Sequence, residues 1–127
     1  MGVELHITRA ECWAENDGAQ ITAEEWLAYV ASDPELELWP ENGPHFVRWL
    51  GVSAHEEPWL DWSDGNIQSK WPDTALYRKM LSIASALCAH VQDDDGDFYS
   101  SPADWEFDPR VALEVPVATK RPWWRFW

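Results

Sequence analysis

Residues 59–68, WLDWSDGNIQ, give the clearest indication of the fold class, because they consist of two short stretches of strand-like sequence joined by a tight turn. The SDG at the centre is typical of a β-hairpin, in which glycine takes a backbone conformation that other residues avoid. Alternation places Leu60 and Trp62 on one face of the first strand, and Trp59 and Asp61 on the other. Because strands joined by so short a turn run in opposite directions, the stretch predicts an antiparallel sheet.

Two helices are expected, one before and one after this hairpin. Residues 73–87 predict the longer helix, with Asp73 as its N-cap. Residues 22–33 predict the other, because Thr22 and Glu25 have the spacing of a capping box. Both segments carry apolar residues three or four positions apart, so each helix has an apolar face to bury. That face of the longer helix consists of Leu76, Tyr77, Met80, Leu81, Ile83, Ala84 and Leu87.

Strand patterns surround these helices. They are expected at residues 3–7, 35–39, 46–50, 89–92 and 97–99, with an edge strand at 111–117. The order of elements predicts an α+β fold, an antiparallel sheet with two helices packed on one face. Residues 1–119 are expected to form a single α+β domain, since a chain of 127 residues supports one core. Residues 120–127 are expected to form a basic, Trp-rich C-terminal tail.

The charge balance limits the class of partner. The formal net charge is −14, and residues 1–64 hold 14 acidic residues against two arginines. Such a surface repels nucleic-acid phosphates and anionic lipid, so neither nucleic-acid binding nor stable membrane insertion is expected. A basic protein is the partner that remains by elimination. The alternative is that acidity only keeps the protein soluble.

The location expected from the sequence is cytoplasmic. The N-terminal residues show no basic region followed by an apolar stretch, and no apolar run approaches the roughly 20 residues of a membrane-spanning helix. Cys12 and Cys88 are expected to be reduced thiols in this setting.

Motifs for catalysis are missing from the sequence, so a non-enzyme with no catalytic residues and no cofactor is expected. The four histidines and two cysteines lack the spacing of a zinc site. A nucleophile turn and a phosphate-binding loop are also absent from the sequence. Paired carboxylates such as Glu24 and Glu25 would suit a glycosidase only if a cleft held them.

The acidic run at residues 93–97, DDDGD, raises the question of a cation site. Alignment with a calcium-binding EF-hand loop places Val91 and Pro102 where carboxylates are required, so that motif fails. The favoured interpretation is a solvated hairpin turn, with another type of cation site left open and no metal ligand assigned.

Tryptophans and acidic residues occur together in two segments, which indicates a binding surface. The chain has 11 tryptophans, more than a core of this size needs. Aromatic anchors surrounded by carboxylates are suited to a basic protein surface. The alternative is that the acids form an ordinary solvated face and the tryptophans cap the sheet. The predicted partner-binding residues are Glu35, Glu37, Glu41, Trp59, Asp61 and Asp64.

The C-terminal tail, KRPWWRFW at residues 120–127, combines basic and aromatic residues. Such a segment can lie at a membrane interface. The favoured alternative is docking on the chain's own acidic surface or on a neighbouring copy, which would give weak self-association.

Several stretches resemble a family of small bacterial proteins of uncharacterised function. They are ITRAE at 7–11, the segment 21–34, DWSDGNI at 61–67, residues 80–87 and VQDDDGDFY at 91–99. In size, acidity and lack of catalytic motifs, the chain is also similar to the acidic immunity proteins that neutralise toxins in interbacterial competition. This second resemblance implies a cytoplasmic inhibitor that covers a basic toxin effector, such as a nuclease. The alternatives are a small carbohydrate hydrolase with a cleft lined by Trp and acid, or an adaptor that uses its C-terminal tail.

Overall fold

The structure is a computed structural model and describes residues 4–108 of the chain. The expected edge strand at 111–117, the end of the expected domain and the C-terminal tail therefore lie outside the described residues.

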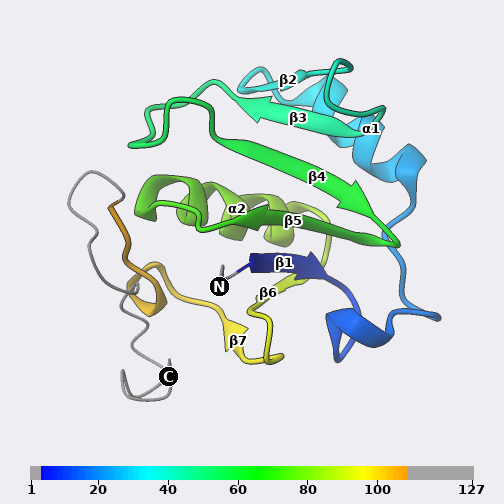
Figure 1. The fold of residues 1–127 in the computed structure, drawn as a ribbon. Helices are drawn as coiled ribbons and strands as arrows, with labels where there is room; N and C mark the ends of the chain where they lie inside the picture. Colours follow the sequence, from blue (N-terminus) through cyan, green and yellow to red (C-terminus); the bar gives the residue numbers. More distant parts are fainter. Residues whose placement is uncertain (1–3, 109–127) are drawn as a thin grey trace.

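The described part of the chain forms one seven-stranded antiparallel sheet, which confirms the predicted α+β fold (Figure 1). The strand order is β2-β3-β4-β5-β1-β6-β7, so the first strand lies between β5 and β6 inside the sheet. The strands are β1 (Glu4–Thr8), β2 (Leu36–Leu38), β3 (Phe46–Trp49), β4 (Trp59–Ser63), β5 (Asn66–Lys70), β6 (His90–Gln92) and β7 (Phe98–Tyr99).

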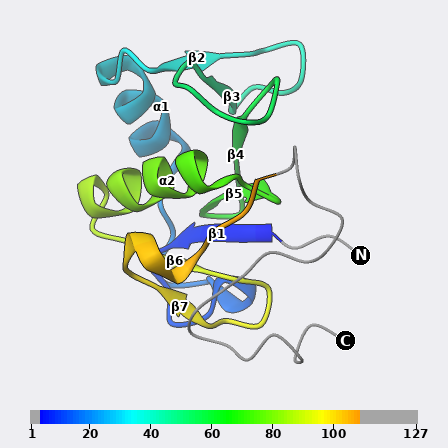
Figure 2. The ribbon, with the colours of Figure 1, turned by 90° about the vertical axis from the view of Figure 1, so that its left-hand side faces the viewer.

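Both helices, α1 (Ala23–Ser32) and α2 (Thr74–Ala86), lie on the same face of the sheet (Figure 2). Their predicted starts are confirmed. The hydroxyl of Thr22 accepts from the Glu25 backbone N–H, and the Glu25 carboxylate accepts from the Thr22 backbone N–H. Asp73 accepts from the Leu76 backbone N–H at the start of α2. Short 3-10 turns, η1 (Trp13–Glu15) and η2 (Pro102–Asp104), complete the described elements.

The core lies between the helices and the covered face of the sheet. Every second residue of the inner strands is directed into it, as the alternation predicts for Leu60. Trp26 and Trp105 are fully buried in this layer, and the indole N–H of Trp105 donates to the Pro72 carbonyl oxygen. The fully buried apolar strand residues are Leu5, Ile7, Val47, Leu60, Ile67 and Val91.

The face of the sheet opposite the helices is polar and aromatic. On β1 it carries Glu4, His6 and Thr8, and the neighbouring strands add Gln68 and Gln92 by register. His6, Thr8 and Gln92 are nevertheless fully buried, because the segment around η1 folds over this part of the face. The backbone N–H of Trp13 donates to the Gln92 side chain and fixes that segment. We call this side of the sheet the open face.

An ion pair joins the β1 end to helix α1. The Arg9 guanidinium donates to both oxygens of the Glu25 carboxylate, at 3.0 and 2.7 Å. These bonds, together with the bond from the Thr22 backbone, lower the pKa of Glu25 from 4.5 to about 2.

Because the folded-state pKa of Glu25 is depressed, its contribution to stability is present at neutral pH and is lost as the pH falls from about 5 toward 2. We expect Glu25→Gln to flatten this part of the pH profile of the free energy of unfolding, measured by urea denaturation. The matched control is Glu24→Gln, next to it on the same helix turn. If the profile of Glu25→Gln were as steep as that of the unmodified chain, Glu25 would not be the source of this pH dependence.

Candidate functional site

An aromatic strip crosses the open face at the β2–β4 end of the sheet. We define it as Trp39, Phe46 and Trp59, all of which are half-buried. The Phe46 and Trp59 rings stack at a centroid distance of 5.4 Å, and Trp39 meets Phe46 edge-on at 5.9 Å. The Arg48 guanidinium lies over the Trp39 ring, 5.0 Å from its centroid.

Strand register brings these residues together. Phe46 pairs with Asp61, and Arg48 pairs with both Trp59 and Glu37, on neighbouring strands. The strip and its charged neighbours therefore share the open face, while Val47 and Leu60, the residues between them on β3 and β4, are buried on the side of the helices.

Asp61 is the carboxylate closest to the strip by register, being paired with Phe46. It is only partly exposed, and burial raises its pKa above the ordinary value. A carboxylate that is already partly desolvated loses little hydration when a cation approaches, which favours pairing with Lys or Arg.

Of the six predicted binding residues, the structure brings Glu37, Trp59 and Asp61 together at this strip. The Glu37 carboxylate accepts from the Arg48 guanidinium. Glu41 is exposed between β2 and β3, and Asp64 is exposed at the β4–β5 turn. Among residues 4–108, no hydrogen bond or ion pair joins the side chain of Glu41 or Asp64 to the strip.

Glu35 is exposed, as predicted, but its carboxylate is directed toward α2 and not to the open face with Glu37. Its carboxylate accepts from the Lys79 ammonium at 2.9 Å and from the Trp49 indole at 3.1 Å. Because β2 begins only at Leu36, the strand alternation does not extend to Glu35, and its side chain turns toward α2. Leu38 shares the face of Val47 by register, as the alternation predicts, but it is 47% exposed on this edge strand.

Lys79 joins Glu35 to Asp33, whose carboxylate it meets at 2.8 Å. The side chains of Lys79 and Asp33 are 11% and 10% exposed, so this ion pair is shielded from solvent. The pKa of Lys79 is raised despite its burial, because the two carboxylates stabilise the charged form. These contacts give Glu35 a structural role at the α2–β2 junction.

We expect Lys79→Met to lower the free energy of unfolding by about 2 kcal/mol, since it leaves the shielded Asp33 carboxylate without its cation. Arg78→Met, the neighbouring exposed position on α2, is the control and should cost less than about 0.5 kcal/mol. Urea denaturation measures both. Equal losses would show that the Lys79 ion pairs are ordinary surface contacts.

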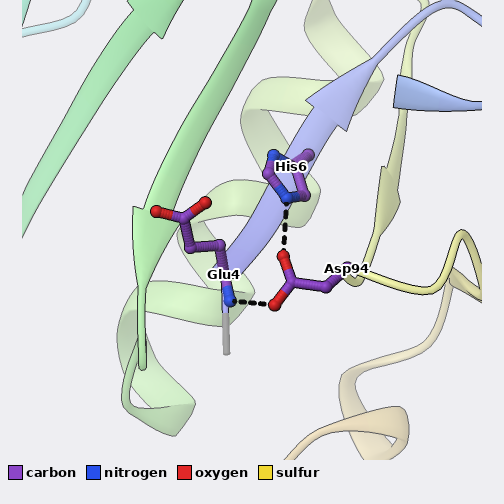
Figure 3. Close-up of side chains that lie close together, drawn as sticks. All are labelled: Glu4, His6 and Asp94. Atoms are coloured by element: carbon purple, nitrogen blue, oxygen red, sulfur yellow. Dashed lines mark hydrogen bonds and ion pairs between the residues drawn. The ribbon is translucent and has the colours of Figure 1, made fainter. Parts of the chain in front are cut away.

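A second group of polar residues lies at the other end of the open face. One ligand atom from each of Glu4, His6 and Asp94 lies within 4.8 Å of the other two. We call this the Glu4–His6–Asp94 cluster (Figure 3). Asp94 accepts from the Glu4 backbone N–H at 3.1 Å, and its other oxygen lies 3.1 Å from Nε2 of His6. This cluster was not predicted from the sequence, in which the histidines lack the spacing of a zinc site.

The acidic run at residues 93–97 forms the turn of the β6–β7 hairpin, as favoured from the sequence. Asp93 is buried and organises this turn. Its carboxylate accepts from the backbone N–H groups of Asp95 and Asp97 and from the Tyr99 hydroxyl. Asp93 thus holds the turn together, while Asp94 is exposed beside it.

A polar hollow of about 320 Å³ lies between the η1 segment and the β4–β5 turn, with Asp17 and Asp64 in its lining. This hollow would be the cleft of a hydrolase. The side-chain amide of Asn16, also in the lining, donates to the side chain of Asn66 at 2.8 Å. The amide of Asn66 donates to the Trp13 carbonyl oxygen. These amides hold the η1 segment on the sheet and are therefore committed within the chain.

The chain matches no protein-family model, no curated protein and no solved structure. The resemblances drawn from the sequence therefore stay predictions. Neither helix within residues 4–108 has the length and apolar character needed to span a membrane.

Proposed function

We propose that this chain is a non-catalytic binding protein that covers a cationic surface on another protein with the aromatic strip of its open face. In its most specific form, the proposal is an immunity protein that neutralises a basic toxin effector such as a nuclease, acting in the cytoplasm. The observation that supports it is the aromatic strip, flanked by Glu37 and Asp61, on a strongly acidic chain.

The charge surplus is too large to be neutralised within the described part of the chain. Residues 4–108 contain 22 acidic residues but only five lysines and arginines. Three of these five cations already form ion pairs, through Arg9, Arg48 and Lys79. The excess carboxylate supplies a long-range field that attracts a basic protein and can raise association rates by roughly 10–10³ at low salt.

The aromatic strip supplies the short-range contact. Partly exposed Trp and Phe side chains offer a large apolar area with few rotatable bonds, and such residues dominate the affinity of many interfaces. Arg48 over Trp39 shows that a guanidinium can stack on this strip. Asp61 beside Phe46 provides a partly desolvated carboxylate for a second cation. The strip thus suits Arg- or Lys-rich surfaces in particular.

The hydrolase alternative has less support. The Asn16 and Asn66 amides in the lining of the polar hollow are used in internal hydrogen bonds, and its carboxylates Asp17 and Asp64 are both exposed. A glycosidase requires one carboxyl group in an environment that keeps it protonated, which exposed positions do not provide. The adaptor alternative depends on the tail, which lies outside the described residues.

We expect immobilised full-length chain to capture a basic protein from lysate of cells that carry this gene, and to release it at high salt. The captured protein, once cloned, should inhibit growth when expressed alone and be tolerated when the chain is co-expressed. The double variant Trp59→Ala/Asp61→Asn should bind it at least 100-fold more weakly, because an aromatic anchor and a carboxylate are both lost.

The control for this test is Phe98→Ala/Glu24→Gln, which removes an exposed aromatic ring and a carboxylate away from the strip. It should bind within about threefold of the unmodified chain. Capture of neutral or acidic proteins only, or equal weakening by both double variants, would contradict the proposal. Circular dichroism of each variant establishes that the fold is retained.

A further inference from the structure

We propose that the Glu4–His6–Asp94 cluster binds a divalent metal ion of intermediate hardness, of which Zn²⁺ is the best fit. The three residues offer one imidazole nitrogen and two carboxylate oxygens, with the ligand atoms within 4.8 Å of one another. This site lies apart from the aromatic strip, with β5 between β4 and β1 in the sheet.

Two of the ligands are held in place before any ion arrives. The imidazole of His6 is fully buried and stacks on the Trp13 ring at 3.7 Å, with only 7° between the planes. The Asp94 carboxylate is fixed by the Glu4 backbone N–H on one oxygen, which turns the other oxygen toward His6. Such positioning reduces the conformational entropy that binding would otherwise cost.

The second observation is an unpartnered nitrogen. Nδ1 of His6 is buried and has no hydrogen-bond partner among residues 4–108. Figure 3 shows that Nε2 of His6 faces the Asp94 carboxylate, whereas the other ring nitrogen, Nδ1, lies on the side of the ring away from it. A buried imidazole that is satisfied on one nitrogen only is unusual for a purely structural histidine. Within residues 4–108 the imidazole therefore has its one hydrogen-bond contact inside the cluster, through Nε2. A cation there would be bound by Nε2, with the ring proton on Nδ1.

The donor set selects the class of metal. Imidazole together with carboxylate suits Zn²⁺ and its first-row neighbours, whereas Ca²⁺ and Mg²⁺ prefer oxygen ligands alone. Zinc–ligand bonds of about 2.0–2.2 Å place two ligand atoms at most about 4.4 Å apart. The ligand atoms of the cluster lie within 4.8 Å of one another, so a small rotation of the partly exposed Glu4 side chain brings them within the distance that zinc requires. Three protein ligands leave one coordination position for water or for a group of another molecule.

The surrounding charge is mixed. Asp95 is exposed next to Asp94 and adds negative potential. Lys70 is the cross-strand neighbour of Glu4 and is exposed. The described residues show no ion pair between Lys70 and Glu4, so the Glu4 carboxylate remains available to a metal ion.

The test is isothermal titration of the metal-free, full-length chain with ZnCl₂. We expect saturable binding of one equivalent, weakened at least tenfold by Asp94→Asn and by Glu4→Gln. Both substitutions change partly exposed carboxylates, so they avoid the folding risk of replacing the buried His6. Asp95→Asn is the matched control and should change the affinity by less than about twofold.

Three outcomes would overturn the proposal. The first is no saturable binding. The second is equal weakening by Asp95→Asn and Asp94→Asn, which would indicate diffuse attraction to acidic residues. The third is a thiolate-to-metal absorption band when Co²⁺ replaces Zn²⁺, since that band would place the metal at Cys12 or Cys88.

Discussion

Side-chain alternation along the strands determines which residues of this molecule lie on the open face. It does so because the two helices cover only the other face of the sheet. Residues such as Val47, Leu60 and Ile7 are buried beneath α1 and α2. Their sequence neighbours must therefore lie on the opposite face, because successive strand residues point to opposite sides. A change of register by one residue would exchange the two sets and expose the core, so the open face is specified as strictly as the core itself.

Local sequence patterns were sufficient to predict the elements that depend on nearby residues. The capping box of Thr22 and Glu25, the N-cap at Asp73 and the β4–β5 hairpin were each predicted correctly. The position of β1 was not predictable, because its pairing with β5 and β6 joins residues far apart in the chain. Trp105 is fully buried in the core, but its burial was not predicted, because it follows a short 3-10 turn in a segment with no periodic pattern.

In the candidate site, too, features set by nearby residues were predictable from the sequence, and features set by long-range pairing were not. Alternation within β4 correctly placed Trp59 and Asp61 on one face. The contributions of Trp39 and Phe46 require the cross-strand register of β3 and β4, which the sequence does not reveal. The direction of the Glu35 side chain depends on where β2 begins. The strand was expected to start at residue 35 but starts at Leu36, so the alternation does not include Glu35. His6 lies 88 positions from Asp94 in sequence, so no spacing rule could connect them.

The open face therefore presents two kinds of chemistry at opposite ends, an aromatic strip with carboxylates and a compact carboxylate–histidine cluster. The most direct measurement is hydroxyl-radical footprinting of the chain alone and in complex with the basic protein that we propose as its partner. We expect Trp39 and Trp59 to become protected in the complex, whereas Trp71, outside the strip, keeps its reactivity. Protection at Trp71 with unchanged reactivity at Trp39 and Trp59 would show that another surface binds the partner.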